Sequence, residues 1–274
     1  MKSYKRAIIY FLVIFSCSAS ILYAADYHTP GSSFAVVIRP WPDMNSTKSK
    51  EALDKWNNYS TWVMKNEEGL TLDPDVTITK VLDKYRQGAG AVEIWTHGCS
   101  SGHVIEVYPY TEDGKAVRNA AYDLYPYGNL IWKDRIVDEG YYIAMRYSEL
   151  PGWVNSQTGM MNNAIFHNQC CYGQYGCDAF MLCGAAAFYG PPGLTSTSED
   201  DIETLWDNLG MNWDDREMYY EYTTGTAYQQ CSNLCFFGEG DMVLGPAVIE
   251  CSQDDGAQVP PEGFDVKVTL DTDI

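Results

Sequence analysis

The sequence predicts an α/β fold, a three-layer sandwich in which helices cover both faces of a mostly parallel central sheet. Short and nearly continuous apolar segments recur along the chain, and such segments are typical of buried strands. Segments with apolar residues at helical spacing lie between them, and several of the apolar segments run into loops that contain glycine. With 274 residues, no internal repeat and no linker, the chain is expected to form one large domain.

The first elements expected in this domain are a strand and a long helix. Residues 34–39 are an apolar run flanked by turn residues, which indicates a buried strand. Ser46 or Thr47 can cap a helix that continues to about residue 64. The apolar stripe of this helix would consist of Leu53, Trp56 and Trp62.

The next part of the chain is expected to place a histidine at the end of a strand. Apolar residues at helical spacing predict a helix over 77–85, which Gly88 and Gly90 would end. Residues 91–95 indicate a second strand that runs directly into His97 and Gly98. Alternation then indicates a strand over 104–110, followed by a turn at 112–114.

The remaining elements include one stretch whose secondary structure the sequence indicates only in part. Residues 115–150 are rich in tyrosine and indicate only a short helix near Ala120 and a strand over 141–145. Beyond this stretch the sequence predicts two compact strands and an acidic helix capped by Ser198, over residues 164–166, 185–189 and 199–209 respectively.

The first 25 residues have the form of a secretory signal peptide. A basic start at Lys2, Lys5 and Arg6 precedes an apolar run, and small residues gather at the cleavage region near Ala24 and Ala25. A retained membrane anchor and a lipid anchor at Cys17 are the less favoured alternatives. The sequence thus predicts a secreted or periplasmic protein with a signal peptide at 1–25, a folded domain at 26–251 and a polar tail at 252–274.

The charge of the chain argues against binding to nucleic acids. The sequence has 37 acidic and 18 basic residues, a net charge of −19. Removal of residues 1–24 takes away three basic residues and no acidic one, which leaves 15 against 37 and a net charge of −22. Such a protein has no surplus of basic groups to neutralise phosphates or to bind an anionic membrane surface. Beyond the signal peptide no segment is long and apolar enough to span a bilayer, so no stable membrane insertion is expected after its cleavage. Peptides or proteins are the expected substrates, basic peptides are electrostatically favoured, and a monomer is expected.

Two loops predicted at the ends of strands carry groups that suit thiol chemistry. One presents His97-Gly98, and the other presents the sequence Gln169-Cys170-Cys171-Tyr172-Gly173. In an open parallel sheet reactive groups belong at the carboxyl ends of the strands. An imidazole there can accept the proton of a thiol, and the thiolate can then attack a carbonyl group. The backbone N–H of Gly98 can approach a substrate oxygen closely, because glycine has no side chain.

The order of these segments resembles the caspase–gingipain group of cysteine peptidases. The loop at 169–173 is similar to the caspase Gln-Ala-Cys-x-Gly box, with Cys170 in the alanine position. Residues 184–190 and 240–246 resemble segments of gingipains, so the resemblance extends over roughly residues 34–250. It implies a caspase-like fold and a secreted cysteine endopeptidase that needs no cofactor. Cys171 would be the nucleophile, His97 its base, and the backbone N–H groups of Gly98 and Cys171 the oxyanion donors.

The sequence departs from this pattern at its cysteines and in its spacing. His97 and Cys171 are 74 residues apart, compared with roughly 50 in caspases. Cys99 lies two residues beyond His97, and Cys170 directly precedes the proposed nucleophile. An inactive relative of the peptidases therefore stays open as an interpretation. His103 and His167 are expected at the surface or in supporting roles, with His167 as an alternative base.

Other readings of the cysteines and acidic residues are weaker. The spacing of Cys177 and Cys183, and of Cys231 and Cys235, suits local disulfides, and Cys99 and Cys251 could also take part. A zinc site would use His97, Cys99 and His103 with cysteines of the 170–177 region, but no Cys-x2-Cys pair supports it. Calcium binding has no loop motif.

Aromatic residues suggest the alternative function. The chain contains 21 Tyr and 8 Trp, and exposed aromatic rings can stack on sugars. A non-catalytic, secreted module that binds carbohydrate or a surface protein is the second hypothesis, although packing in the core is the expected role of most of these rings.

Overall fold

The computed structural model describes most of the domain predicted from the sequence. The described residues are 30–57, 59–66, 69–155, 161, 163–194, 199–214, 217–220, 222–231 and 233–244. The predicted signal peptide, Ser198, Cys251 and the predicted polar tail lie outside these residues. Among the described residues no helix has both the length and the apolar character needed to cross a membrane.

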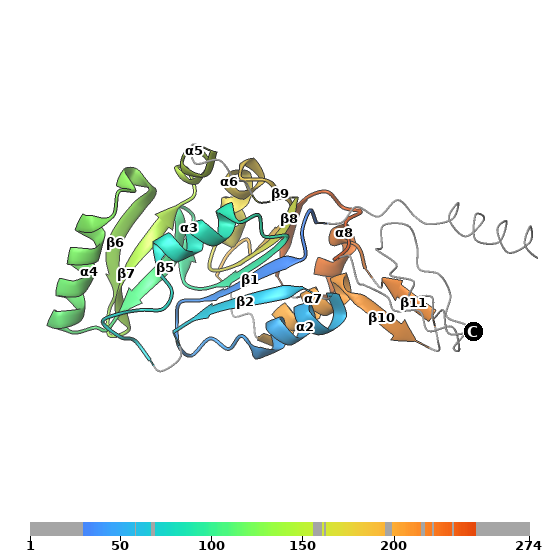
Figure 1. Ribbon diagram of the computed structural model, residues 1–274, viewed down its shortest axis with the longest axis horizontal. Coiled ribbons are helices and arrows are strands. Elements are labelled where there is room, and N and C mark those ends of the chain that lie inside the picture. The colour runs from blue at the N-terminus through green and yellow to red at the C-terminus, as the bar shows by residue number, and fades with distance from the viewer. Residues whose placement is uncertain are drawn as a thin grey trace, which may run out of the picture.

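A six-stranded sheet forms the centre of the molecule (Figure 1). Its strands are β1 (Phe34–Arg39), β2 (Ser60–Lys65), β3 (Ala91–Trp95), β8 (Ala164–Gln169), β9 (Ala185–Gly190) and β12 (Cys235–Gly238). They lie in the order β12-β9-β8-β3-β1-β2, and only β12 is antiparallel to its neighbour. The predicted α/β class with a mostly parallel sheet is therefore confirmed.

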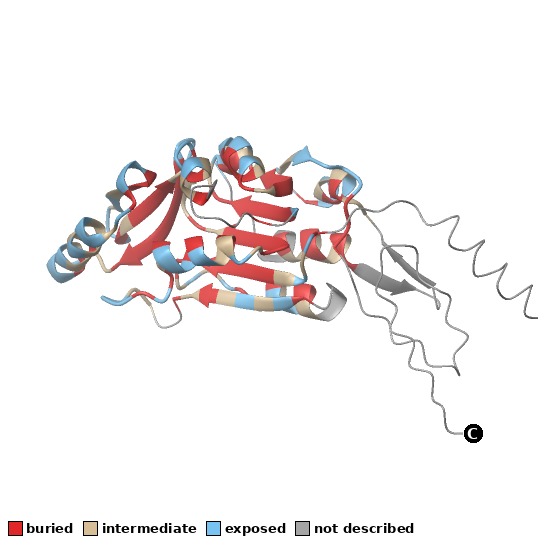
Figure 2. Cartoon of the chain, turned by 45° about the horizontal axis from the view of Figure 1, so that its top comes forward, coloured by how far each residue is buried: buried red, intermediate tan, exposed pale blue. Residues whose placement is uncertain are grey.

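Helices cover both faces of this sheet. One face packs against α3 (Ile78–Arg86), α5 (Leu150–Asn155) and α6 (Cys177–Leu182), and the other against α2 (Thr47–Asn57), α7 (Glu199–Leu209) and α8 (Thr224–Ala227). Alternate residues of β1 show the division, since Val36 and Ile38 enter the first core while Ala35 and Val37 enter the second. Strands buried on both faces have the continuous apolar sequence expected of a parallel sheet, and the inner strands are buried along nearly their whole length (Figure 2).

The helix predicted over 77–85 is confirmed as α3. The Thr77 hydroxyl caps it by accepting a hydrogen bond from the Lys80 N–H at 3.3 Å. The helix buries an apolar stripe made of Ile78, Val81, Leu82 and Tyr85. Gly88 follows with φ of +78°, a conformation that glycine adopts without steric cost.

The single helix predicted from 46 to about 64 is wrong. The structure ends α2 at Asn57 and forms β2 over Ser60–Lys65, which pairs in parallel with β1 from end to end. Helical spacing of the apolar residues is outweighed here by pairing with a buried strand. Trp62 is consequently not part of a buried stripe but is 55% exposed on the edge strand.

A second, antiparallel sheet lies between β3 and β8 in the chain. It consists of β4 (Gly98–Cys99), β5 (Gly102–Tyr108), β7 (Gly140–Arg146) and β6 (Ile131–Ile136), in that spatial order, with α4 (Glu112–Leu124) packed on it. It occupies the end of the molecule at the left of Figure 1. The strand predicted over 141–145 and the helix near Ala120 are confirmed, while β6 was not predicted.

The turn predicted at 112–114 is wrong, because these residues form the first turn of α4. The Thr111 hydroxyl accepts a hydrogen bond from the Gly114 N–H at 3.0 Å, and acidic residues follow the cap as helix starts prefer. Gly114 fits there because a Cβ would lie 2.1 Å from the Pro109 carbonyl oxygen. The glycine thus serves close packing and does not mark a turn.

The remaining elements of the described residues are a short hairpin and three 3-10 helices. The hairpin pairs β10 (Met211–Asp214) with β11 (Glu217–Tyr220), and 3-10 helices occur at Gly128–Leu130, Gly173–Gly176 and Tyr228–Gln230. The predicted bounds of α7, 199–209, are confirmed.

Candidate functional site

The two loops with the predicted catalytic residues lie side by side. β3 and β8 are neighbours in parallel, with Trp95 opposite Gln169 at their carboxyl ends. Beyond this pair the Thr96 N–H donates a hydrogen bond to the Gln169 carbonyl oxygen at 3.1 Å. His97 follows Thr96 and Cys170 follows Gln169, so both loops start from one point on the edge of the sheet.

The glycine of each motif is required by the packing of these loops. A Cβ on Gly98 would lie 2.6 Å from the Cys170 sulfur, and one on Gly173 would lie 2.2 Å from the Asn168 carbonyl oxygen. Atoms at such distances would overlap. The histidine loop therefore packs directly on the cysteine loop through Gly98, and the cysteine loop closes on its own strand through Gly173.

Cys170 is a buried and protonated thiol. Its sulfur lies 3.4 Å from the Tyr147 hydroxyl and 3.4 Å from Asn168 Oδ1, with no exposed surface. Burial raises the pKa of the Cys170 thiol to about 12. A thiol with this environment is a packing residue and a poor nucleophile.

Cys171 occupies the turn that follows this buried thiol and is partly exposed. Tyr172, the next residue, adopts the left-handed conformation with φ of 59° and ψ of 29°. The Gly173 N–H closes the turn on the Cys170 carbonyl oxygen at 2.9 Å. Because the N–H and C=O of a trans peptide point in opposite directions, the Cys171 N–H points away from the turn.

The same geometry applies to Gly98. The His97 carbonyl oxygen accepts a hydrogen bond from the Val104 N–H of β5 at 2.9 Å. The N–H of Gly98 belongs to the same peptide unit and so points away from β5. The N–H groups of Gly98 and Cys171, the predicted oxyanion donors, therefore point away from the hydrogen bonds that the preceding carbonyl groups accept.

His97 is held by two groups that the sequence did not indicate. Its Nε2 lies 3.3 Å from Glu139 Oε2, in the turn between β6 and β7, and its ring meets the edge of Trp41 at a centroid distance of 4.8 Å. The side chain of His97 is 42% exposed. Among the described residues its polar contact is with Glu139, not with Cys171. Glu139 and Trp41 lie far from both motifs in the sequence, so no local pattern could reveal them.

A buried cluster of Asn168, Tyr147 and His103 packs against the cysteine loop. Asn168 donates hydrogen bonds to the Tyr147 hydroxyl at 2.9 Å and to the Gly173 carbonyl at 3.0 Å. His103 Nδ1 lies 3.2 Å from Asn168 Oδ1, and the His103 ring stacks on Phe180. Burial lowers the pKa of His103 to about 4, which keeps the ring neutral. The supporting role expected of His103 agrees with this position, whereas a surface position does not.

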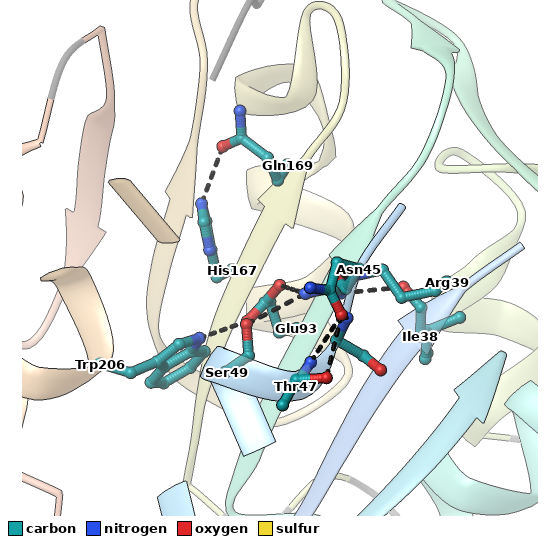
Figure 3. Close-up of polar contacts among 10 residues, drawn as sticks. Ile38, Arg39, Asn45, Thr47, Ser49, Glu93, His167, Gln169 and Trp206 are labelled. Atoms are coloured by element: carbon teal, nitrogen blue, oxygen red, sulfur yellow. Dashed lines mark hydrogen bonds and ion pairs between the residues drawn. The ribbon is translucent and has the colours of Figure 1, made fainter. Parts of the chain in front are cut away.

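A second buried polar cluster lies on the other face of the sheet (Figure 3). Arg39 and Glu93 form an ion pair without exposed surface, and Trp206 of α7 donates a hydrogen bond to Glu93 Oε2. His167 Nε2 lies 2.9 Å from Gln169 Oε1 on the same side. Burial lowers the pKa of His167 to about 4. His167 is fully buried on this face, so the alternative in which it replaces His97 as the base has no geometric support.

The predicted local disulfides are wrong for both pairs. None of the seven cysteines in the described part of the chain forms a disulfide with another of them. Cys177 and Cys183 lie at opposite ends of α6. Six residues of helix span about 9 Å, which exceeds the Cα separation that a disulfide allows. Cys231 is buried and Cys235 begins β12, and no disulfide joins these two residues.

The predicted zinc alternative finds no ligand group in the structure. Across the described ranges no three His, Cys, Asp or Glu side chains are grouped so that they could hold a metal ion. His103, one of the proposed ligands, faces Asn168 instead.

No protein-family model and no curated protein matches this chain.

Proposed function

We propose that the chain is a secreted cysteine endopeptidase with a caspase–gingipain-like fold, with Cys171 as nucleophile and His97 as base. One observation carries the proposal: the His-Gly loop and the Cys-Cys loop leave neighbouring parallel strands at the same point and pack on each other through Gly98 and Cys170. The three-layer architecture agrees with the resemblance, and the sequence of residues 1–25 supports secretion.

The difference between the two adjacent cysteines supports the choice of Cys171. Cys170 is enclosed and its high pKa keeps it protonated, whereas Cys171 is partly exposed on a tight turn. A nucleophile must reach a substrate carbonyl, and Cys171 is the member of the pair that can do so.

The reaction begins with the transfer of the Cys171 proton to His97. The contact with Glu139 uses Nε2, so Nδ1 is the ring nitrogen that accepts the proton, and the Glu139 carboxylate stabilises the imidazolium ion. The sulfur attacks the scissile carbonyl carbon, and the N–H groups of Gly98 and Cys171 stabilise the resulting oxyanion. Collapse expels the amine, which takes the proton from His97. Water, deprotonated by His97, then hydrolyses the thioester and restores the thiol.

The cysteine pair offers a matched test of this proposal. The secreted form of the chain is assayed with a fluorogenic peptide library varied at the residue before the scissile bond. Cys171→Ala is expected to lower kcat/KM at least about a thousandfold, because the nucleophile is removed. Cys170→Ala makes the same chemical change one residue away and is expected to keep activity within about tenfold. Full activity in Cys171→Ala would overturn the proposal.

One observation favours the alternative, a carbohydrate-binding module. Trp62 is exposed beside a cavity of about 520 Å³ that also presents Lys65, Asp75, Asp83 and Gln87. The Lys84 ammonium lies over this ring, 3.8 Å from its centroid, so a sugar would stack on the opposite ring face with these polar groups around it. This alternative predicts saturable glycan binding that Cys171→Ala leaves unchanged, together with the absence of cleavage in the peptide library.

A further inference from the structure

Strand β2 forms one edge of the central sheet (Figure 1). Among the described residues its one strand partner is β1. The N–H groups of Ser60, which begins β2, and of Asn66, directly after it, bond carbonyl oxygens of the β1 segment at 2.9 and 3.4 Å. Because the backbone groups of successive residues in a strand point to opposite sides, those of Thr61, Val63 and Lys65 point out of the sheet.

Two of these outward N–H groups have no acceptor in the part of the chain that the structure describes. The Thr61 N–H donates to Asp54 Oδ1 of α2 at 3.3 Å, which closes the start of the edge. The N–H groups of Val63 and Lys65 have no such acceptor there, and both residues are partly exposed. Backbone donors two residues apart on a sheet edge are the groups that an added strand pairs with.

The cavity of about 520 Å³ beside Trp62 lies along this edge. Residues 62–65 of β2 line one side of it, and Lys80, Asp83 and Lys84 of α3 line another. Side chains of an added strand would alternate between the two faces of the sheet. Every second side chain would therefore project towards α3, so the residues of this helix would select which side chains bind.

The cavity has an excess of basic groups although the protein is acidic. Three of its lining residues are lysines, namely Lys65, Lys80 and Lys84. The ammonium groups of Lys80 and Lys84 contact neutral oxygens, the Asp75 carbonyl at 2.8 Å and the Gln87 amide at 3.1 Å. Asp75 and Asp83 also line the cavity, but the Asp83 carboxylate already pairs with an arginine of α3 at 2.9 Å. Within the described ranges none of the three lysines has a carboxylate within 4.0 Å.

We propose that the edge of β2 binds an extended peptide segment as an additional strand, with acidic side chains at alternate positions facing the lysines of α3. The backbone groups of Val63 and Lys65 would supply affinity, and the lysines would supply selectivity. Lys65 disfavours pairing with a basic strand, including β2 of a second copy of the chain. The net charge of the protein repels an acidic segment only at long range, where salt screens it.

The first experiment measures the binding of a fluorescent peptide by anisotropy. The probe is Thr-Glu-Val-Glu-Val-Glu-Thr, and the secreted form of Cys171→Ala is used so that the peptide is not cleaved. We expect saturable binding that the double variant Lys80→Gln/Lys84→Gln weakens at least about tenfold, because two charged contacts are lost. The control Lys115→Gln/Lys133→Gln removes two lysines at the second sheet and should change affinity by less than about twofold.

The second experiment tests the strand geometry. Two versions of the peptide are N-methylated, one at its Glu amides and the other at its Val amides. Only one of these sets can face β2, so one version should lose binding and the other should keep it. Val63→Pro removes an outward N–H, which an edge strand tolerates, and is expected to weaken binding at least about fivefold. Thermal unfolding verifies that each variant is folded.

Three outcomes would overturn the inference: no saturable binding of the peptide, binding that the variant of Lys80 and Lys84 leaves intact, or equal effects of the two methylated sets. A glycan that binds through Trp62 while the peptide does not bind would likewise overturn it and assign the cavity to the carbohydrate alternative. None of these measurements needs cleavage, so failure of the proposed peptidase activity leaves this inference standing.

Discussion

At the scale of single residues, the two motif glycines illustrate what the sequence could and could not predict. The pattern indicates Gly98 as a backbone donor, but it does not show that Gly98 must also make room for the Cys170 sulfur. That requirement depends on a residue 72 positions later in the chain, and local patterns carry no information about such a contact. The same holds for Glu139, which contacts His97 from a turn of the second sheet.

The contact between Gly98 and Cys170 predicts a coupled pair of mutations. Gly98→Ala places a methyl group 2.6 Å from the Cys170 sulfur, so we expect a loss of stability of roughly 1–3 kcal/mol and at least tenfold lower activity. In a Cys170→Ala background the sulfur is absent, and part of both losses should be recovered. Urea unfolding and peptidase assays of the four proteins measure this. Strictly additive effects would show that the two residues do not contact each other in the folded protein.

At the scale of elements, β8 was predicted only in its apolar half. Residues 164–166 were expected as a strand, and the structure extends it through His167, Asn168 and Gln169, all fully buried. A strand predicted from hydrophobicity stops at the first polar residue. Polar side chains are nevertheless stable in a core when each forms a hydrogen bond there. The partners here come from other elements, such as Tyr147 for Asn168. The missed strand β2 has the same cause, since its parallel pairing with β1 cannot be read from local spacing.

The buried histidines predict how stability depends on pH. Burial lowers the pKa of His103 and of His167 to about 4, whereas an unfolded histidine titrates near 6.5. At about pH 7.5 and above both are neutral in both states and their contribution is complete. As the pH falls from 6.5 towards 4 the unfolded state binds protons that the folded state does not, and stability is lost by roughly 3 kcal/mol per histidine.

Urea unfolding at pH 7, 6, 5 and 4.5 tests this expectation. The midpoint should fall with pH, and the fall should be shallower in His167→Gln, which removes one of the two groups. Glu106, whose pKa is raised by burial, acts in the opposite direction and is the same in both proteins. An identical pH dependence in the wild type and the variant would show that His167 is not buried as a neutral ring.

At the scale of the whole molecule, the order of segments along the chain predicted the architecture better than any one segment did. Alternating strands and helices indicated a mostly parallel sheet covered on both faces, and that arrangement is present. The long separation of His97 and Cys171 also has a structural explanation. The antiparallel sheet and α4 occupy the chain between them, while β3 and β8 remain neighbours. An insertion of this kind lengthens the spacing without separating the two loops.

The central claim is that Cys171 is the reactive thiol of this sheet edge, and limited alkylation of the native protein tests it most directly. The secreted form is treated with iodoacetamide at pH 7, and labelled peptides are mapped by mass spectrometry while peptidase activity is followed. We expect the loss of activity to follow the labelling of Cys171, with Cys170 and Cys183 unlabelled because both are buried. Exposed Cys99 is expected to react as well, and its alanine variant serves as the control. Full activity after complete labelling of Cys171, or a Cys171 found in a disulfide in active protein, would contradict the claim.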